Sequence, residues 1–285
     1  MSITPEDESG QVSAASAGDG MRAAQLLALA AAAFLLVGLL GAQAARPGLN
    51  LVAATALAIA GGIGFIAISV VLVGLIVRLP LSWKAQLGLV VLCGLVSAGA
   101  KIAKVSLVGD LFLFAAAIFF GILVSRVIKE RNMIVPVAVA AAAVDTYGVY
   151  WGFVSIMARK APEVVRHLTA AVPGATAEVP VQLLGAIGIG DFLFMGIFVA
   201  AVYRLGMNRR GTLWALFAVF LTVPVVFGLL QLAALPGLPF LGLAVVGANW
   251  RYFHFSRAEK FALLYAALAV AGIIGLAWWI TRVLS

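Results

Sequence analysis

The chain has 285 residues, of which 64% are hydrophobic and only 11% are charged. Soluble globular domains carry about 25% charged residues, so this composition excludes an ordinary soluble enzyme or binding domain. The net charge of +8 is scattered among loops rather than gathered in a basic stripe with interleaved aromatic residues, which argues against a nucleic-acid partner. Cys93 is the only cysteine, and His167 and His254 are isolated, so we expect no intrachain disulfide, no metal site and no cofactor.

Residues 1–20 are polar and acidic, and this composition predicts a disordered N-terminal tail. About nine apolar segments follow, most of them close to the ~20 residues that a helix needs to cross a membrane. They are Arg22–Ala45, Leu51–Val77, Gln86–Ala100, Val105–Val124, Met133–Ala158, Leu183–Tyr203, Thr212–Leu232, Pro236–Trp250 and Phe261–Ile280. Because short basic loops separate them, the sequence predicts an all-α polytopic membrane protein embedded in a lipid bilayer.

The first apolar segment has two interpretations. Met21-Arg22, the apolar run and Ala42-Gln43-Ala44 together resemble a signal peptide with its cleavage site. The acidic residues before Met21 instead favour an uncleaved first helix, which is the interpretation we adopt. The chain then divides into the tail (1–20), about four N-terminal helices (21–132), a core with the polar motifs (133–250), and a C-terminal loop with the last helix (251–285).

The longest loop, Arg159–Gln182, contains three prolines, and we expect a short surface helix near Glu163–Ala171 within it. If the N-terminus is inside the cell, the inside loops carry twelve Lys and Arg residues and the outside loops carry seven. The positive-inside rule therefore favours an inside N-terminus. The short loops and the Ala-rich composition favour a prokaryotic cell (inner) membrane.

Three carboxylates fall within apolar segments, where a charged group costs several kcal/mol. Asp110 follows Lys104 by six residues, near one end of its segment, so we predict a solvated or paired structural role. Asp145 and Asp191 lie on consecutive antiparallel segments, about 20 Å and about 15 Å from the loop that joins them. Both depths are near the middle of a hydrocarbon layer of ~30 Å, so we expect the two acids to face each other.

Two facing carboxylates cannot both ionise at low cost, so the pair holds a shared proton. A water bound between them becomes a nucleophile toward a carbonyl, because one acid accepts its proton while the other polarises the carbonyl. Gly188 and Gly190, just before Asp191, are expected to leave room for a neighbouring helix or a substrate backbone. The same pair can instead relay protons in a transporter, and the glycines can serve helix packing alone.

Three motifs in chain order resemble the presenilin and signal peptide peptidase family of intramembrane aspartyl proteases. GIGDFLF, from Gly188 to Phe194, is similar to the Gly-x-Gly-Asp motif of that family. AAAVDTYGVYW resembles the helix that carries the family's first aspartate, and LPGLPFLG resembles its Pro-Ala-Leu motif at Pro236-Gly237-Leu238. The resemblance covers roughly residues 133–250. The chain departs from it at Val144, where the family usually has Tyr, and at Gly237, where it has Ala.

The resemblance implies a presenilin-like catalytic helix bundle that cuts peptide bonds within single-span membrane proteins or signal peptides. The residues it assigns are Asp145 and Asp191 as the catalytic pair, with Gly188, Gly190, Pro236, Gly237 and Leu238 shaping the substrate site. Prepilin peptidases share the Gly-x-Gly-Asp motif, but Lys and Leu usually follow it, whereas Phe192 and Leu193 follow it here. A proton-coupled transporter and an inactive family member that binds membrane proteins are the alternatives.

Overall fold

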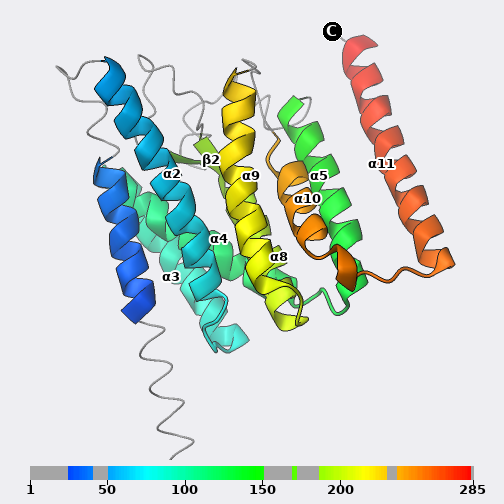
Figure 1. Cartoon of the computed structure of the whole chain (residues 1–285), viewed down its shortest axis with the longest axis horizontal. Coiled ribbons are helices and arrows are strands. Elements are labelled where there is room, and N and C mark those ends of the chain that lie inside the picture. The colour runs from blue at the N-terminus through cyan, green and yellow to red at the C-terminus, as the bar shows by residue number, and fades with distance from the viewer. Residues whose placement is uncertain (1–24, 41–50, 151–168, 172–185, 230–235, 284–285) are drawn as a thin grey trace, which may run out of the picture.

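The structure is a computed structural model that describes residues 25–40, 51–150, 169–171, 186–229 and 236–283. The described part is an array of helices with one short pair of strands (Figure 1). The helices are Gln25–Leu40, α2 (Leu51–Ile76), α3 (Trp83–Ile102), α4 (Ser106–Ser125), α5 (Ile134–Tyr150), α8 (Ile189–Arg204), α9 (Arg209–Leu229), α10 (Leu238–Ala248) and α11 (Arg257–Val283). Two 3-10 turns, Arg131–Met133 and Trp250–Tyr252, precede α5 and follow α10.

Each predicted apolar segment overlaps one of these helices, so the helical fold class is confirmed for the described residues. Three helical stretches are long and apolar enough to cross a membrane: Trp83–Ile102, Leu107–Ser125 and Arg131–Val149. Other described helices are apolar but shorter, such as Gln25–Leu40 and Leu238–Ala248. The number of membrane spans therefore stays a prediction.

The helix α8 lies at the centre of the array, in contact with α2, α4, α9 and α10 (Figure 1). Its side chains from Met195 to Val202 are almost all buried, and Phe192 is 1% exposed. A helix that is apolar on all sides is stable only when other apolar groups surround it, which explains this position. The residues directly before Phe192 are consequently held against the core.

Two glycines allow α4 and α8 to touch backbone to backbone. A methyl group on Gly196 of α8 would lie 2.9 Å from the carbonyl oxygen of Ile118 and 3.1 Å from its Cα. A methyl group on Gly121 of α4 would lie 2.9 Å from the backbone nitrogen of Ile197 and would clash with the carbonyl oxygen of Leu193. Such contacts are closer than a real Cβ tolerates, so glycine is required on both helices for this approach.

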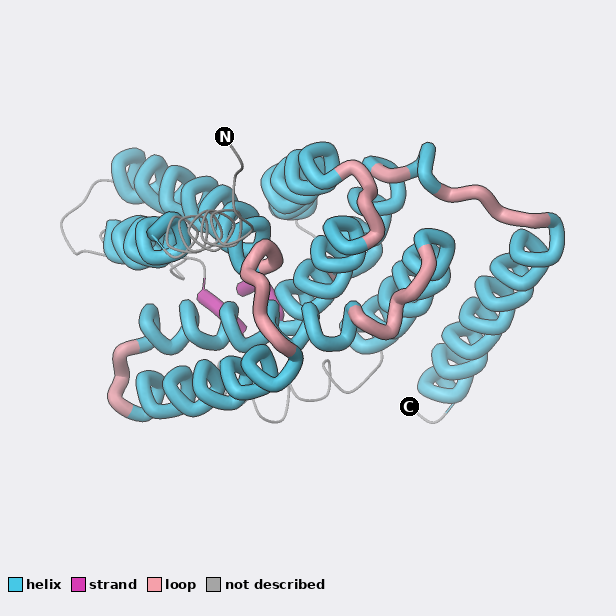
Figure 2. The backbone as a smooth tube through the Cα atoms, turned by 90° about the horizontal axis from the view of Figure 1, so that it is seen from below, coloured by secondary structure: helices cyan, strands magenta, loops and turns pink. Residues whose placement is uncertain are grey.

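The strand pair replaces part of two predicted helices. Strand β1 (Thr169–Ala171) pairs antiparallel with β2 (Ala186–Gly188), and Figure 2 shows the pair lying among the helices. The predicted surface helix near 163–171 is therefore wrong for residues 169–171, and its other residues lie outside the described part. The predicted segment Leu183–Tyr203 becomes helical only at Ile189. A strand forms its hydrogen bonds with a neighbouring strand, and the hydrophobic periodicity of one segment does not identify that neighbour.

Asp110 is paired, as one of the two predicted structural roles requires, and its partner is Lys101. Its Oδ1 lies 3.2 Å from the Lys101 Nζ, and both side chains are largely buried between α3 and α4. Ser97 supports the same hairpin by donating its hydroxyl to the carbonyl oxygen of Gly109 at 2.8 Å. Lys101 lies at the end of α3 and faces α4, so it reaches Asp110 across the hairpin.

Polar contacts join the start of α11 to the start of α5. The Ser256 N–H donates to Glu259 Oε2 at 2.7 Å, and the Glu259 N–H donates to Ser256 Oγ at 3.2 Å, which is a capping box. Asn132 donates to Glu259 Oε1 at 3.3 Å and to the His254 carbonyl oxygen at 2.8 Å. The hydrogen bonds from Ser256 and Asn132 hold the pKa of Glu259 below its usual range.

A buried amide joins the end of α10 to the start of α9. Asn249 is 0% exposed and donates from Nδ2 to Thr212 Oγ1 at 2.7 Å and to the Val245 carbonyl oxygen at 2.9 Å. Its Oδ1 accepts from the Asn208 N–H at 2.9 Å. All of these groups are paired, so the network fixes the position of α10 relative to α9.

Asn249→Ala is expected to lower the free energy of unfolding by about 2–3 kcal/mol, because it removes two buried hydrogen bonds, leaves the Asn208 N–H without its acceptor and leaves a small cavity. Chemical unfolding of the detergent-solubilised protein, followed by circular dichroism, measures this change. Thr222→Ala on α9 is the control, since its exposed hydroxyl donates to the Ala218 carbonyl oxygen of the same helix, and a change within about 0.5 kcal/mol is expected. Equal effects of the two substitutions would show that the network does not hold α9 and α10 together.

Candidate active site

Asp145 and Asp191 come from different helices and meet the same short segment at the start of α10. Asp145 belongs to α5, and its Oδ2 accepts a hydrogen bond of 3.0 Å from the Leu238 N–H. Asp191 belongs to α8, and its carboxylate packs against the backbone of Gly237. The two carboxylates also interact electrostatically with each other. The tertiary structure thus brings together three motifs that are separated by many residues in the chain.

The start of α10 supplies a donor to Asp145 because of where the helix begins. Leu238 is the first residue of α10, and the first N–H groups of a helix have no partner within it. Pro239 at the next position has no N–H and fits the first turn. The positive end of the helix dipole adds to the attraction for an anionic carboxylate. Pro236 is buried directly before this turn.

Asp191 lies in the first turn of α8, because the predicted helix begins only at Ile189 and residues 186–188 form β2. The depth of Asp191 in a membrane stays a prediction. Gly188 is the N-cap residue, and its backbone N–H lies near the Asp191 carboxylate and favours its ionised form. An acid three residues after the N-cap reaches back to that N–H in the manner of a capping box. Each aspartate therefore interacts with the N-terminal backbone of a helix.

Gly237 leaves the space that the Asp191 carboxylate occupies. A methyl group at this position would clash with Asp191 Oδ1 and would lie 3.0 Å from Cγ and 3.1 Å from Oδ2. Alanine in place of Gly237 would therefore displace the carboxylate. Glycine in place of the alanine of the Pro-Ala-Leu motif is therefore consistent with the position of the Asp191 carboxylate in this chain.

The two glycines of the Gly-x-Gly-Asp motif are not in close contact with the Asp191 carboxylate. A methyl group on Gly188 would make only an ordinary contact of 3.7 Å with Asp191 Oδ2. A methyl group on Gly190 would have no atom within 4 Å. The glycine that contacts the Asp191 carboxylate closely is Gly237, and the room for a substrate predicted at Gly188 and Gly190 stays a prediction. Gly190 is exposed and faces open space, so a bound segment has room to approach there.

Val144, the second departure from the family pattern, is 72% exposed. A helix turns by about 100° per residue, so Val144 and Asp145 point in different directions. The Val144 side chain is not packed between the two carboxylates, and its difference from Tyr leaves their contacts with α10 unchanged.

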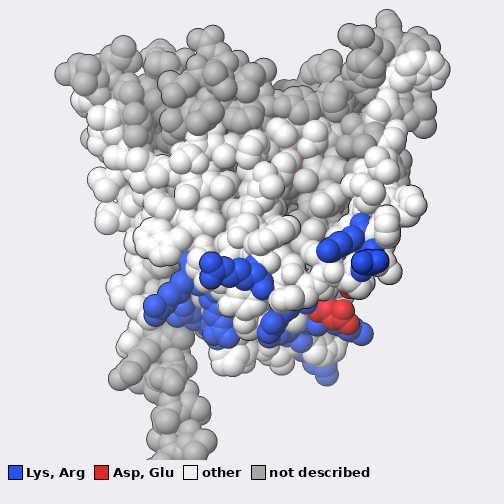
Figure 3. Space-filling view, turned by 45° about the vertical axis from the view of Figure 1, so that its right-hand side comes forward, with Lys and Arg blue, Asp and Glu red and all other residues white. Residues whose placement is uncertain are grey.

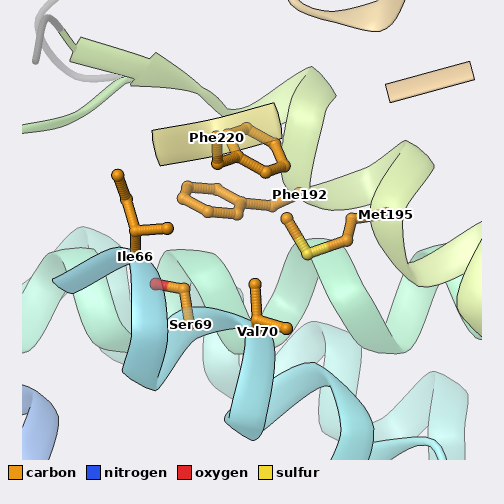
Figure 4. Close-up of a pocket in the computed structure, with 6 residues that line it drawn as sticks. All are labelled: Ile66, Ser69, Val70, Phe192, Met195 and Phe220. Carbon is orange, nitrogen blue, oxygen red and sulfur yellow. The ribbon is translucent and has the colours of Figure 1, made fainter. Parts of the chain in front are cut away.

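A small cavity adjoins the site on the side of α2 and α9. It is lined by Ile66, Ser69, Val70, Phe192, Met195 and Phe220 (Figure 4). The Ser69 hydroxyl is buried and has no hydrogen-bond partner among the described residues. The cavity measures about 10 Å³, and a buried water needs at least that volume and two to four polar partners. Only one polar group lines it, so this is a packing gap and not a substrate pocket.

Among the residues that the structure describes, no three His, Cys, Asp or Glu side chains are grouped as metal ligands would be. The described groups at the site are two carboxylates and nearby backbone N–H groups. This convergence of Asp145 and Asp191 on Gly237-Leu238 is the main evidence on function, since comparison with protein-family models, curated proteins and solved structures gives no match.

Proposed function

We propose that this chain is an integral membrane protein of about nine helices that hydrolyses peptide bonds within membrane-embedded substrate segments. Membrane location is supported by large apolar side chains that stay exposed on the array, such as Leu95 (68%), Ile102 (84%) and Leu243 (69%). Soluble proteins rarely expose contiguous apolar surface on this scale. Trp83 and Trp250 are also exposed and lie at helix ends, as expected of residues at a membrane–water interface.

The observation that carries the proposal is the approach of two aspartates to one backbone segment. Asp145 is held by the Leu238 N–H, while Asp191 lies against Gly237 and interacts electrostatically with Asp145. Neither aspartate has a salt bridge to a Lys or Arg among the described residues. An acid pair without a cationic partner retains a proton, which general acid–base hydrolysis requires.

In the proposed mechanism, one ionised aspartate removes a proton from water while the protonated aspartate donates to the scissile carbonyl oxygen. The new C–O bond gives a tetrahedral intermediate, and the proton then moves to the leaving nitrogen as the C–N bond breaks. The Leu238 N–H stabilises the ionised form of Asp145, so Asp145 is the better first base and Asp191 the better first acid. The roles reverse as the intermediate collapses.

The proposed substrates are single-span membrane proteins or signal peptides whose helix unwinds locally. A helical amide is shielded from attack, so the substrate must be extended where it is cut. The extended residues of β2 end directly before α8, three residues from Asp191, and the exposed Gly190 leaves room beside the acid. Extended backbone at this point suits an extended substrate.

Purified protein in liposomes, incubated with a single-span test substrate between about pH 4 and pH 8, tests the proposal. We expect two product fragments and inhibition by a transition-state analogue of aspartyl proteases. Absence of cleavage throughout this range would contradict the protease. Proton-driven solute uptake by the same liposomes, without cleavage, would favour the transporter.

Gly237→Ala is expected to lower the cleavage rate by 10- to 100-fold, on the order of the effect of moving a catalytic group by about 1 Å. The added methyl group displaces the Asp191 carboxylate, while the Leu238 N–H stays in place. Single-turnover cleavage measures the change. Gly247→Ala on the same helix is the control, because a methyl group there meets no atom within 4 Å. Full activity of Gly237→Ala would show that the Asp191 position seen here is not the reactive one.

A further inference from the structure

One end of the helix array carries most of the positive charge. The Lys and Arg residues at this end are Arg78, Lys84, Arg126, Lys129, Arg131, Arg204, Arg209, Arg210, Arg251, Arg257 and Lys260. In Figure 3, the blue Lys and Arg side chains on the visible face gather over its lower part. Cross-helix contacts hold these ends together: Arg204 donates to the Ser125 and Ile128 carbonyl oxygens at the end of α4, and Arg131 donates to the Leu205 carbonyl oxygen at 3.1 Å.

Few of the described acids balance this charge. Among the described residues, Glu130 and Glu259 are the carboxylates at this end, and the Lys101–Asp110 salt bridge lies at the opposite end of α3 and α4. Neither Arg78 nor Arg209 forms a salt bridge within the described part of the chain. Unbalanced positive charge attracts anions from the surroundings.

Two of these guanidinium groups lie over the same aromatic ring. The Arg78 Cζ is 5.6 Å from the centroid of the Tyr203 ring, and the Arg209 Cζ is 5.0 Å from it. Arg78 donates to the Tyr203 hydroxyl from Nε at 3.3 Å and from Nη2 at 3.1 Å. Arg209 donates to the Tyr203 carbonyl oxygen at 3.2 Å. Each guanidinium has five N–H groups, so donors are left over on both.

The surrounding elements fix this arrangement. Gly74 lets α2 pack on Leu213 of α9, and a methyl group there would lie 3.2 Å from Leu213 Cδ1. Arg209 is the first residue of α9, and the Asn208 side chain caps this helix by accepting from the Gly211 N–H at 3.0 Å. The positive end of the α9 dipole therefore adds to the charge of the two arginines.

We propose that Arg78, Tyr203 and Arg209 form a binding site for the phosphate headgroup of an anionic phospholipid. This proposal depends on the membrane location proposed above and does not depend on the proposed proteolytic activity. Guanidinium groups match phosphate oxygens in geometry and charge. Exposed apolar side chains lie within two turns on both helices, Val71 on α2 and Trp214 on α9, and provide a surface for acyl chains. This apolar surface favours a lipid over free phosphate as the ligand.

Binding of phosphatidylglycerol to the detergent-purified protein, counted by native mass spectrometry, tests the site. We expect the double variant Arg78→Gln/Arg209→Gln to bind phosphatidylglycerol about 10-fold more weakly than wild type, since each basic group near a lipid surface contributes measurably. The matched control is Arg251→Gln/Arg257→Gln, which removes the same charge from the same end and is expected to change binding less than 3-fold, on the order of a non-specific charge effect. Phosphatidylcholine is expected to bind weakly to all of them.

Equal weakening of phosphatidylglycerol binding in the two double variants would contradict the proposed site, because it would show that the lipid is attracted only by the overall positive charge of this end. Competition by millimolar inorganic phosphate would overturn the lipid as the ligand. If the Gln variant does not fold, Arg78→Lys/Arg209→Lys keeps the charge without the planar fork, and unchanged lipid binding by it would also contradict the proposed site. All measurements are repeated in the Asp191→Asn background, so failure of proteolysis and failure of lipid binding stay distinguishable. Alkaline extraction of cell membranes tests the membrane location separately.

Discussion

Asp145→Asn and Asp191→Asn are each expected to lower the rate of substrate cleavage by at least about 1,000-fold. Asparagine has nearly the same shape as aspartate but neither accepts nor releases a proton in this range, so the water between the two side chains is no longer activated. Because the two acids act as one unit, the double variant is expected to be no worse than either single variant. Cleavage of a single-span test substrate under single-turnover conditions measures these rates.

Asp110→Asn is the matched control, because Asp110 is the third carboxylate within an apolar segment and pairs with Lys101 away from the site. Its rate per folded molecule is expected to stay within 3-fold of wild type, about the spread of substitutions outside an active site. More than a tenth of the wild-type rate in either Asp145→Asn or Asp191→Asn would contradict the proposed acid pair. Loss of folding is monitored by gel filtration and circular dichroism, so that inactivity is not confused with misfolding.

Gly196→Ala is expected to lower the free energy of unfolding by about 3 kcal/mol, near the upper end for an added methyl group in a packed core. The methyl group would lie 2.9 Å from the Ile118 carbonyl oxygen, and backbone atoms cannot move aside as a flexible side chain does. The helices α4 and α8 would have to separate, and their other contacts would weaken with them. Gly121→Ala is expected to act similarly, since its methyl group meets the backbone of α8.

The two glycine substitutions concern one interface, so their effects are expected to be less than additive in the double variant. Gly88→Ala on α3 is the control, because a methyl group there meets no atom within 4 Å, and a change within about 0.5 kcal/mol is expected. Unfolding by urea in detergent micelles measures all of these variants. A loss below about 0.5 kcal/mol for Gly196→Ala would show that α4 and α8 do not touch as closely as the structure has them.

The helices follow from the sequence because their cause is local. Long apolar runs with few charges form helices wherever backbone hydrogen bonds must be satisfied within one segment. The boundaries of α2 and α4 accordingly differ from the predicted ones by one residue at each end or less. The predicted segment at Leu183–Tyr203 differs more, because β2 is stabilised by β1, which precedes it by more than ten residues.

The sequence by itself determined the candidates for the proposed chemistry: Asp145 and Asp191 in apolar segments, and a Pro-Gly-Leu segment after one further helix. Only the tertiary structure decided how they are arranged. The Leu238 N–H meets Asp145 across 93 residues of chain, and Gly237 meets the Asp191 carboxylate from a third helix. Contacts between distant segments depend on how helices pack side by side, and the local periodicity of one helix does not specify its neighbour. For this reason the glycine that makes room for the acid was found at Gly237, and not within the motif that contains the acid.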